Sequence, residues 1–218
     1  MPVLIMEAPR NCLSTMYWLK MSRYEADDFC YPGTSVLINK LGIDNQAQLD
    51  TVEADLTAIR LVEVAEKPYT GNFDLQHLCH LHQCVFQDLY DWAGKIRTVD
   101  ISKGNSRFAN VQFIESHLNK ELATVANVAS LKSLRPESFI DVLTHLMSEM
   151  NAVHPFREGN GRINRLFCAQ LAESVGYFID YSLMDLVEYL EAMIISFHGD
   201  EAPLKRILLN ITSKIESE

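Results

Sequence analysis

The sequence predicts a mainly α-helical, single-domain protein with one small β-hairpin. Apolar residues recur at intervals of three and four through most of the 218-residue chain, the spacing of one face of an α-helix. Only the stretch 97–112 lacks this helical spacing. It predicts a hairpin, because "TVDIS" is typical of a strand and "KGNS" supplies turn residues. The chain is long enough for one well-filled core and contains no repeat, linker or low-complexity tract.

The first expected element follows a turn at Pro32 and Gly33, where Thr34 or Ser35 would cap a short helix that ends near Gly42. Helical periodicity then predicts a series of helices, which in chain order are 46–66, 74–92, 114–125, 139–150, 163–171, 183–197 and 203–215. The hairpin at 97–112 interrupts this series after its second member.

Bulk composition excludes several classes of function. A hydrophobic content of 48% and a charged content of 22% are normal for a folded protein, and the net charge of −10 argues against a broad nucleic-acid-binding surface. No apolar run approaches the length needed to span a bilayer, and Glu7 and Arg10 interrupt the N-terminal "VLIM" too early for a secretion signal. The five cysteines are odd in number and are expected to be reduced thiols of a cytoplasmic protein.

The stretch "HPFREGNGRINR" at 154–165 concentrates residues that suit phosphate binding. It reads as a loop leading into a helix, whose first N–H groups and positive dipole end attract anions. Gly159 and Gly161 have no Cβ, so a bulky ligand can approach the backbone closely. Arg162 and Arg165 are three positions apart on one helical face, and two guanidinium groups there suit a polyphosphate better than a single phosphate.

Two further residues of this stretch supply chemistry. Glu158 precedes the glycines, and a carboxylate beside phosphates is the usual hard ligand of Mg²⁺. His154 is mostly neutral at pH 7 with an ordinary pKa of about 6.5, so it can accept a proton. The pattern predicts attack by a hydroxyl on a nucleotide phosphate, with His154 as the base. The residues alone also allow a plain connecting loop with capping glycines and solvated arginines.

Three other features have simpler explanations than a functional site. His80 and Cys84 could share a helical face and hold zinc, but no second cluster of ligands is evident. Asp185 and Glu188 are expected to form a solvated helix face. Cys168 is expected to be a buried thiol rather than a nucleophile.

The stretch at 154–165 resembles the motif of the Fic family, HPFx[D/E]GNGRxxR, and matches it at every specified position. The segment "LHQCVFQDLYDWAGKIRTVDISKGNSRFAN" resembles the helix and the flap hairpin that precede this motif, and "YPGTSVLINKLGI" resembles the N-terminal segment of the bacterial toxin-like branch. The resemblance implies a Fic fold, a single helical domain at 31–218 with its flap hairpin at about 97–112, preceded by an N-terminal extension at 1–30.

The resemblance also implies an activity, the transfer of AMP from ATP to a hydroxyl side chain of a target protein. His154 would be the general base, and Glu158 would hold Mg²⁺. The other expected nucleotide-binding residues are Gly159, Asn160 and Gly161 in an anion nest, Arg162 at the phosphates, Arg165 at the γ-phosphate and Tyr189 beside the adenine. The flap would dock the target segment by main-chain pairing, through Ser102, Lys103, Gly104 and Phe108.

Alternatives within and beyond this family remain open. The branch typified by the Doc toxin phosphorylates its target and carries a lysine where Gly161 stands here, so Gly161 favours adenylylation. Some relatives transfer UMP or phosphocholine instead. A nucleotide-binding interaction module without turnover is a further alternative, although the intact His154 argues against it.

The resemblance further implies control by a partner. Many Fic proteins are held inactive by a helix with the pattern [S/T]xxxE[G/N], whose glutamate pairs with the second motif arginine, here Arg165. Only Ser133 with Glu137, in a loop, and Thr212 with Glu216, in the last expected helix, have the S/T-to-E spacing, and each glutamate is followed by serine. We therefore expect a separate small antitoxin to supply the glutamate. The ATPase subunits of DNA gyrase and topoisomerase IV are candidate targets by analogy.

Overall fold

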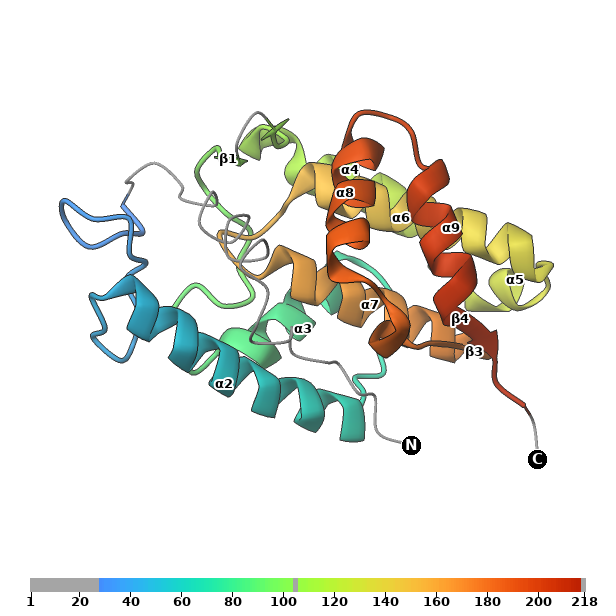
Figure 1. The fold of residues 1–218 in the computed structure, drawn as a ribbon, viewed down its shortest axis with the longest axis horizontal. Helices are drawn as coiled ribbons and strands as arrows, with labels where there is room; N and C mark the ends of the chain where they lie inside the picture. Colours follow the sequence, from blue (N-terminus) through green and yellow to red (C-terminus); the bar gives the residue numbers. More distant parts are fainter. Residues whose placement is uncertain (1–27, 104–105, 217–218) are drawn as a thin grey trace.

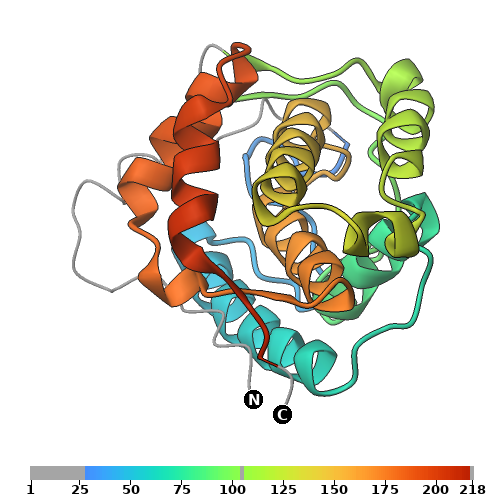
Figure 2. The same cartoon turned by 90° about the vertical axis from the view of Figure 1, so that its right-hand side faces the viewer.

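The fold is organised around helices α6 and α7, which are joined by the 154–159 loop. The computed structural model describes residues 28–103 and 106–216. Within these ranges α6 (Pro136–Val153) packs on α7 (Asn160–Ser174) at the centre, and the other helices surround the two (Figures 1 and 2). This arrangement confirms the expected mainly α-helical fold.

The surrounding helices cover the central pair on different sides (Figure 2). α2 (Gln46–Glu66) packs on α3 (Leu75–Phe86), and α3 in turn contacts α7. α4 (Ile114–Ala123) contacts α6 and is followed by the short α5 (Val128–Lys132). α8 (Leu186–Phe197) and α9 (Ala202–Ile211) pack on each other and on α6. The central helices therefore hold the middle of the core, with Leu143, Met147, Phe167 and Leu171 fully buried.

Two small antiparallel strand pairs complete the part of the chain that the structure describes. β1 (Ser102–Lys103) pairs with β2 (Ser106–Arg107) and forms the hairpin expected within 97–112. β3 (Tyr177–Ile179), which follows α7, pairs with β4 (Thr212–Lys214), which follows α9. Two 3₁₀ helices, η1 (Val111–Phe113) and η2 (Tyr181–Leu183), lie beside these strands in the sequence.

Side-chain caps fix where the helices that support the 154–159 loop begin. The Asn45 side chain accepts a hydrogen bond from the Gln48 N–H (3.0 Å), so α2 starts at the expected residue. The Asp74 side chain accepts one from the His77 N–H (2.8 Å) at the start of α3. α6 has Pro136 in its first turn, where the missing N–H needs no partner.

The short helix expected at 34–42 is wrong. The chain turns at Gly33, whose φ is +75°, and an antiparallel bridge joins Cys30 to Leu37. The Thr34 hydroxyl donates to the Tyr31 carbonyl (2.9 Å) and accepts from the Val36 N–H (3.1 Å). These local bonds of the threonine side chain compete with a helix and stabilise the turn instead.

Two expected helices end earlier than the periodicity indicates. The helix expected at 74–92 ends at Phe86, after which Leu89 and Tyr90 turn into the core in a series of turns. The helix expected at 203–215 ends at Ile211. The next residues form strand β4, which pairs with β3. Glu216 therefore does not lie on a helix, which corrects the expected position of this candidate inhibitory glutamate.

The expected boundary near residue 30 stays a prediction, because residues 1–27 lie outside the described ranges. None of the described helices combines the length and the apolar character needed to cross a lipid bilayer.

Candidate active site

The 154–159 loop has an unusual backbone at both of its ends. His154 ends α6 in the left-handed conformation, with φ of +50°, and its N–H donates to the Met150 carbonyl (3.0 Å). Gly159 precedes the first residue of α7 with φ of +81°, and a Cβ on it would lie 2.2 Å from the Phe86 ring. Only glycine fits there, so Gly159 is required for the shape of the loop, and it is itself buried.

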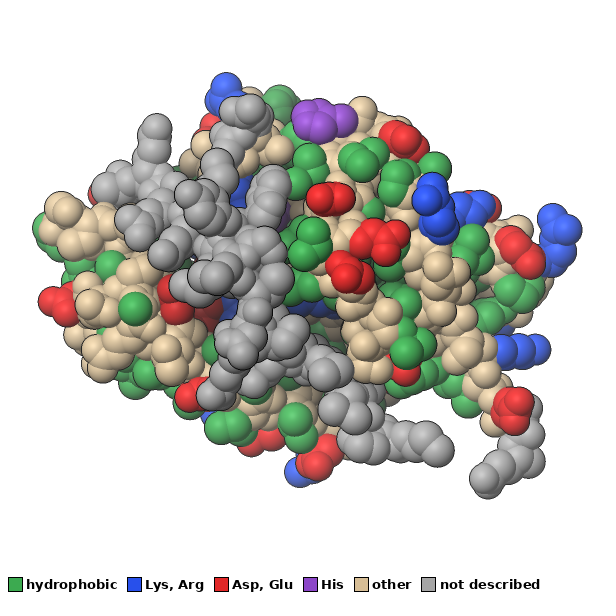
Figure 3. Space-filling model, viewed as in Figure 1, with side chains coloured by type: hydrophobic (Ala, Val, Ile, Leu, Met, Phe, Trp, Pro, Cys, Tyr) green, Lys and Arg blue, Asp and Glu red, His purple; other side chains and the backbone are tan. Residues whose placement is uncertain are grey.

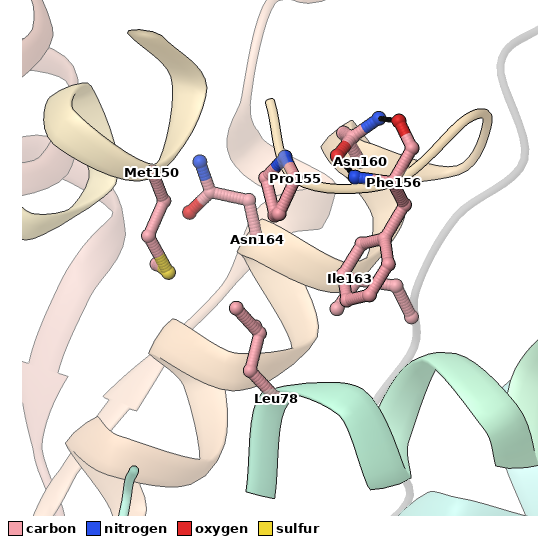
Figure 4. A pocket seen from close by; sticks show the side chains of 7 residues that line it. All are labelled: Leu78, Met150, Pro155, Phe156, Asn160, Ile163 and Asn164. Atoms are coloured by element: carbon pink, nitrogen blue, oxygen red, sulfur yellow. Dashed lines mark hydrogen bonds between the residues drawn. The ribbon is translucent and has the colours of Figure 1, made fainter. Parts of the chain in front are cut away.

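Asn160 braces the loop from inside. Its Oδ1 accepts from the Phe156 N–H and its Nδ2 donates to the Phe156 carbonyl, each at 2.8 Å (Figure 4). The side chain is 7% exposed, so these bonds hold the loop against the start of α7. Its expected contact with the α-phosphate stays a prediction. The small cavity of about 10 Å³ below the loop is lined mainly by apolar side chains and has room for one water-sized sphere.

The half-buried His154 is held as a neutral imidazole. Its Nδ1 lies 3.1 Å from the Asn151 carbonyl, which can only accept, so Nδ1 carries the proton and Nε2 has the lone pair, which bonds to none of the described residues. Burial, with a smaller effect of the charges of Lys103 and Arg97, lowers the pKa of His154 to about 3 despite the opposing effect of the Asn151 bond. Bound phosphates would raise this pKa again, because their negative charge favours the imidazolium.

Arg162 projects from the first turn of α7 toward α2. Its Nη1 donates to Thr57 Oγ1 (3.0 Å) and its Nη2 donates to Glu53 Oε1. The guanidinium lies over the Phe86 ring, 4.8 Å from the centroid. Burial alone would lower the pKa of Arg162, but Glu53 and Glu158 raise it overall, so Arg162 stays charged beside the start of the helix.

Glu158 lies between the backbone of the loop and Arg162. Its Oε1 accepts from the Gly159 N–H (2.8 Å) and lies 3.7 Å from Arg162 Nη2. Burial raises the pKa of Glu158 and the Glu53 carboxylate raises it further, while Arg162 opposes them. A carboxylate oxygen beside an anion-binding helix start fits the oxygen preference of Mg²⁺.

Metal-capable clusters in the described part of the chain lie elsewhere. Two groups of three converging side chains occur around α4, α6 and α9: His117, Glu121 and Glu149, and His145, Glu149 and Glu201. Neither includes a residue of 154–165. A Mg²⁺ ion at Glu158 would therefore take most of its oxygens from the nucleotide and water, as Mg²⁺ commonly does.

The second motif arginine, Arg165, lies one turn further along α7. Its guanidinium carbon lies 5.9 Å from the centre of the Tyr189 ring. No carboxylate among the described residues forms an ion pair with Arg165, Glu216 included. Gly161 is exposed, and a Cβ there would be an ordinary 3.6 Å from the Arg165 Nη1. The protein itself therefore does not require glycine at 161, and the open space is available to a ligand.

Tyr189 lies deeper than a base-stacking residue would. Its side chain is 2% exposed, and its hydroxyl donates to Met147 Sδ (3.6 Å). The structure brings it next to Arg165 but leaves almost none of its ring open, so its expected adenine contact stays a prediction.

The flap hairpin lies against His154. Phe108 is buried and stacks on the imidazole, with ring centroids 3.8 Å apart. Ser102 pairs with Arg107, and Lys103 with Ser106, in the hairpin. Gly104 lies outside the described ranges. The structure thus places the flap where the sequence predicted it, and docking of a target remains a prediction.

Sequence reasoning missed Arg97, which fastens the flap to the His154 loop. Arg97 is 3% exposed and donates to the carbonyls of His154 (2.8 Å), Val153 (3.1 Å), Val99 (2.7 Å) and Ala109. A buried guanidinium at the carbonyl end of α6 satisfies groups that the helix leaves open. Its position in "GKIRTVD" carried no signal that pointed to this contact.

His82 was also missed, because its segment was considered only as a zinc site. The Gly94 N–H donates to His82 Nδ1 (2.8 Å), so Nε2 carries the proton and donates to the Glu158 carbonyl (3.0 Å). The ring is fully buried between Phe86 and Phe156. His82 therefore anchors the loop from α3.

The remaining candidates have structural explanations. His80 and Cys84 contact each other (3.4 Å), but His77 bonds to Gln170 (3.0 Å) and His82 to the 154–159 loop, so these ligands do not converge. Cys168 is fully buried, and burial raises the pKa of its thiol. Asp185 and Glu188 are exposed as expected, and acidic side chains gather over α8 on the face shown in Figure 3.

Comparison with known proteins decides the family. The model of the Fic/DOC family matches residues 72–172. The probable protein adenylyltransferase y4lH of Sinorhizobium fredii is 40% identical over 189 residues, covering 84% of this chain and 96% of that protein. The chain belongs to the Fic/DOC family. The protein adenylyltransferase VbhT of Bartonella schoenbuchensis is 41% identical over 83% of this Fic chain, which spans only 38% of VbhT.

Solved structures share the fold of this Fic protein. The N-terminal Fic domain of a VirB-translocated Bep effector from Bartonella quintana, solved with bound ADP, has a TM-score of 0.80 and 27% identity. The two chains are covered to 86% and 95%, this one first. BepC from Bartonella tribocorum, solved with bound AMPPNP, has a TM-score of 0.79 and 25% identity, with coverage of 86% and 97%. The expected Fic fold is therefore confirmed.

Proposed function

We propose that this Fic protein is a protein adenylyltransferase that transfers AMP from ATP to a hydroxyl side chain of a target protein. The observation that carries the proposal is His154, a neutral imidazole whose Nε2 lone pair bonds to none of the described residues, next to the helix start at the exposed Gly161 and the charged Arg162. Relatives that match most of this chain are named protein adenylyltransferases, and related Fic domains were solved with ADP or AMPPNP.

The chemistry follows from these positions. The target hydroxyl oxygen attacks the α-phosphorus of ATP, and His154 Nε2 takes the hydroxyl proton. The bond from the α-phosphorus to the bridging oxygen breaks, and pyrophosphate leaves with that oxygen. Arg162 and the backbone N–H groups at the start of α7 stabilise the charge on the phosphates. Mg²⁺ held by Glu158 would neutralise charge on the leaving group.

The test is labelling of candidate targets with ATP that carries ³²P at either the α or the γ position. AMP transfer places the α label, and not the γ label, on the target. The opposite result would assign the chain to phosphate transfer, which the exposed Gly161 disfavours because the phosphorylating branch has a lysine there. Labelling from UTP alone would identify a different nucleotide donor.

We further propose that a separate small antitoxin supplies the glutamate that pairs with Arg165. Two observations support this: Arg165 has no carboxylate partner in the described ranges, and Glu216 does not lie on a helix. The chain alone should be active and equal to Glu216→Gly. Strong activation by Glu216→Gly would show that inhibition is internal. The ATPase subunits of DNA gyrase and topoisomerase IV are the first target proteins to test.

A further inference from the structure

Glu53 connects α2 to the motif across 109 positions of the sequence. Its Oε1 accepts from Arg162 Nη2, and its Oε2 accepts from the hydroxyl of Tyr90. The Glu53 side chain is only 13% exposed, and Tyr90 is 1% exposed. The two oxygens of the carboxylate therefore bond to two separate segments, helix α7 and the turns that follow α3.

Thr57 supports the same contact one turn further along α2. Its hydroxyl donates to the Glu53 carbonyl (2.7 Å), which leaves a lone pair of Oγ1 to accept from Arg162 Nη1 (3.0 Å). With the Phe86 ring below it at 4.8 Å, the guanidinium is fixed at both terminal nitrogens and on one face. A guanidinium has five N–H groups, and among the described residues Glu53 and Thr57 accept one each, which leaves three for a ligand.

We propose that Glu53, assisted by Thr57, is a positioning residue that holds Arg162 in the orientation in which its remaining N–H groups bind the nucleotide phosphates. The inference rests on the proposed function only in giving Arg162 a phosphate to bind. An inhibitory contact is the alternative, in which phosphates must displace Glu53. The geometry opposes it, because displacement would strip the buried Tyr90 hydroxyl and the carboxylate of their partners.

The experiment compares Glu53→Ala and Glu53→Gln with the wild type in calorimetric binding of a non-hydrolysable ATP analogue. We expect Glu53→Ala to weaken binding about tenfold, within the range of coupling between contacting groups. Glu53→Gln should retain part of the affinity, since its amide oxygen can still accept from Arg162. The matched control is Glu63→Ala, which removes a carboxylate of the same helix that pairs with Arg60 (2.7 Å), and it should bind normally.

A double-mutant cycle separates positioning from a general structural effect. In an Arg162→Ala background, Glu53→Ala should cause no further loss of affinity. Wild-type or tighter binding by Glu53→Ala would overturn the proposal, as would an equal loss in the Arg162→Ala background. If Glu53→Ala does not fold, Thr57→Val removes the second acceptor and should weaken binding about threefold, whereas unchanged affinity would count against positioning. The assay measures binding of the analogue and needs no transfer of AMP to a target. The role of Glu53 can therefore be tested even if the chain proves not to be an adenylyltransferase.

Discussion

Phe108 stacks face to face on His154, with ring centroids 3.8 Å apart and an angle of 14° between the planes. Besides its expected role in docking the target by main-chain pairing, the flap therefore orients the proposed base through Phe108. Replacing Phe108 with alanine should lower the rate of AMP transfer about tenfold, since a stacked pair contributes on the order of 1 kcal/mol and the freed ring also loses its orientation. Nucleotide affinity should change little.

The matched variant is Phe108→Tyr, which keeps the stacking ring and should keep most of the activity. Initial rates and analogue binding, measured on both variants, check the prediction. Equal rates for the wild type and Phe108→Ala would show that the stacking does not position His154.

Arg97 should be among the most sensitive residues for stability. Its side chain donates to the carbonyls of His154, Val153, Val99 and Ala109, all of which Arg97→Ala would leave without that donor. We expect a loss of about 3 kcal/mol or more in the free energy of unfolding, measured with urea. Arg97→Lys should recover little, because an ammonium cannot reproduce the planar fork. A loss below about 1 kcal/mol would contradict this account.

His82 should make the stability depend on pH. Burial lowers its pKa from 6.5 to about 3, so below pH 6.5 the unfolded chain binds a proton that the folded chain excludes. Stability should therefore fall as the pH drops from 6.5 toward 3, by about 1.4 kcal/mol per pH unit from this group. His154 contributes in the same direction, whereas His145, whose pKa is raised by its Glu201 bond, contributes in the opposite direction.

The measurement is the free energy of unfolding at pH 7 and pH 5 for the wild type and His82→Gln. A glutamine can still accept from Gly94 and donate to the loop, but it does not titrate. The drop between the two pH values should be smaller in the variant by about 2 kcal/mol. An identical drop would mean that His82 does not carry this dependence.

Alanine substitutions at the two motif glycines should have different effects, one on the stability of the fold and the other on ATP binding. A Cβ at Gly159 would lie 2.2 Å from Phe86 at a φ of +81°, so Gly159→Ala should destabilise the fold by about 2 kcal/mol or more. A Cβ at Gly161 meets only an ordinary 3.6 Å contact, so Gly161→Ala should melt normally while binding ATP more weakly. Thermal melting and analogue binding, measured on both, test the contrast. Equal stability of the two variants would contradict it.

Local patterns in the sequence predicted most of the helices but not the contacts between them. α2 matches its expected range because its cap and its apolar periodicity both act within the helix. The prediction of a helix at 34–42 was wrong because the hydrogen bonds of Thr34 stabilise a turn there, and an antiparallel bridge joins Cys30 to Leu37 across that turn. β3 and β4 were missed because each short strand is defined by its distant partner.

The candidate site shows the same division. Residues of 154–165 were found because the motif is contiguous, and the structure brings His154, Glu158 and Arg162 together with the helix start. Glu53, His82 and Arg97 support that motif from other elements. Each has an ordinary sequence context, so only the tertiary packing distinguishes it from a surface charge or a core histidine.

We propose His154 as the base for AMP transfer. The most direct measurement is α-³²P-ATP labelling of a target by the wild type and by His154→Ala, together with the affinity of both for a non-hydrolysable ATP analogue. Labelling should fall by at least about a hundredfold in His154→Ala while analogue affinity stays within about threefold of the wild type, as expected for loss of a general base. Substantial labelling by His154→Ala would contradict the assignment of His154 as the base.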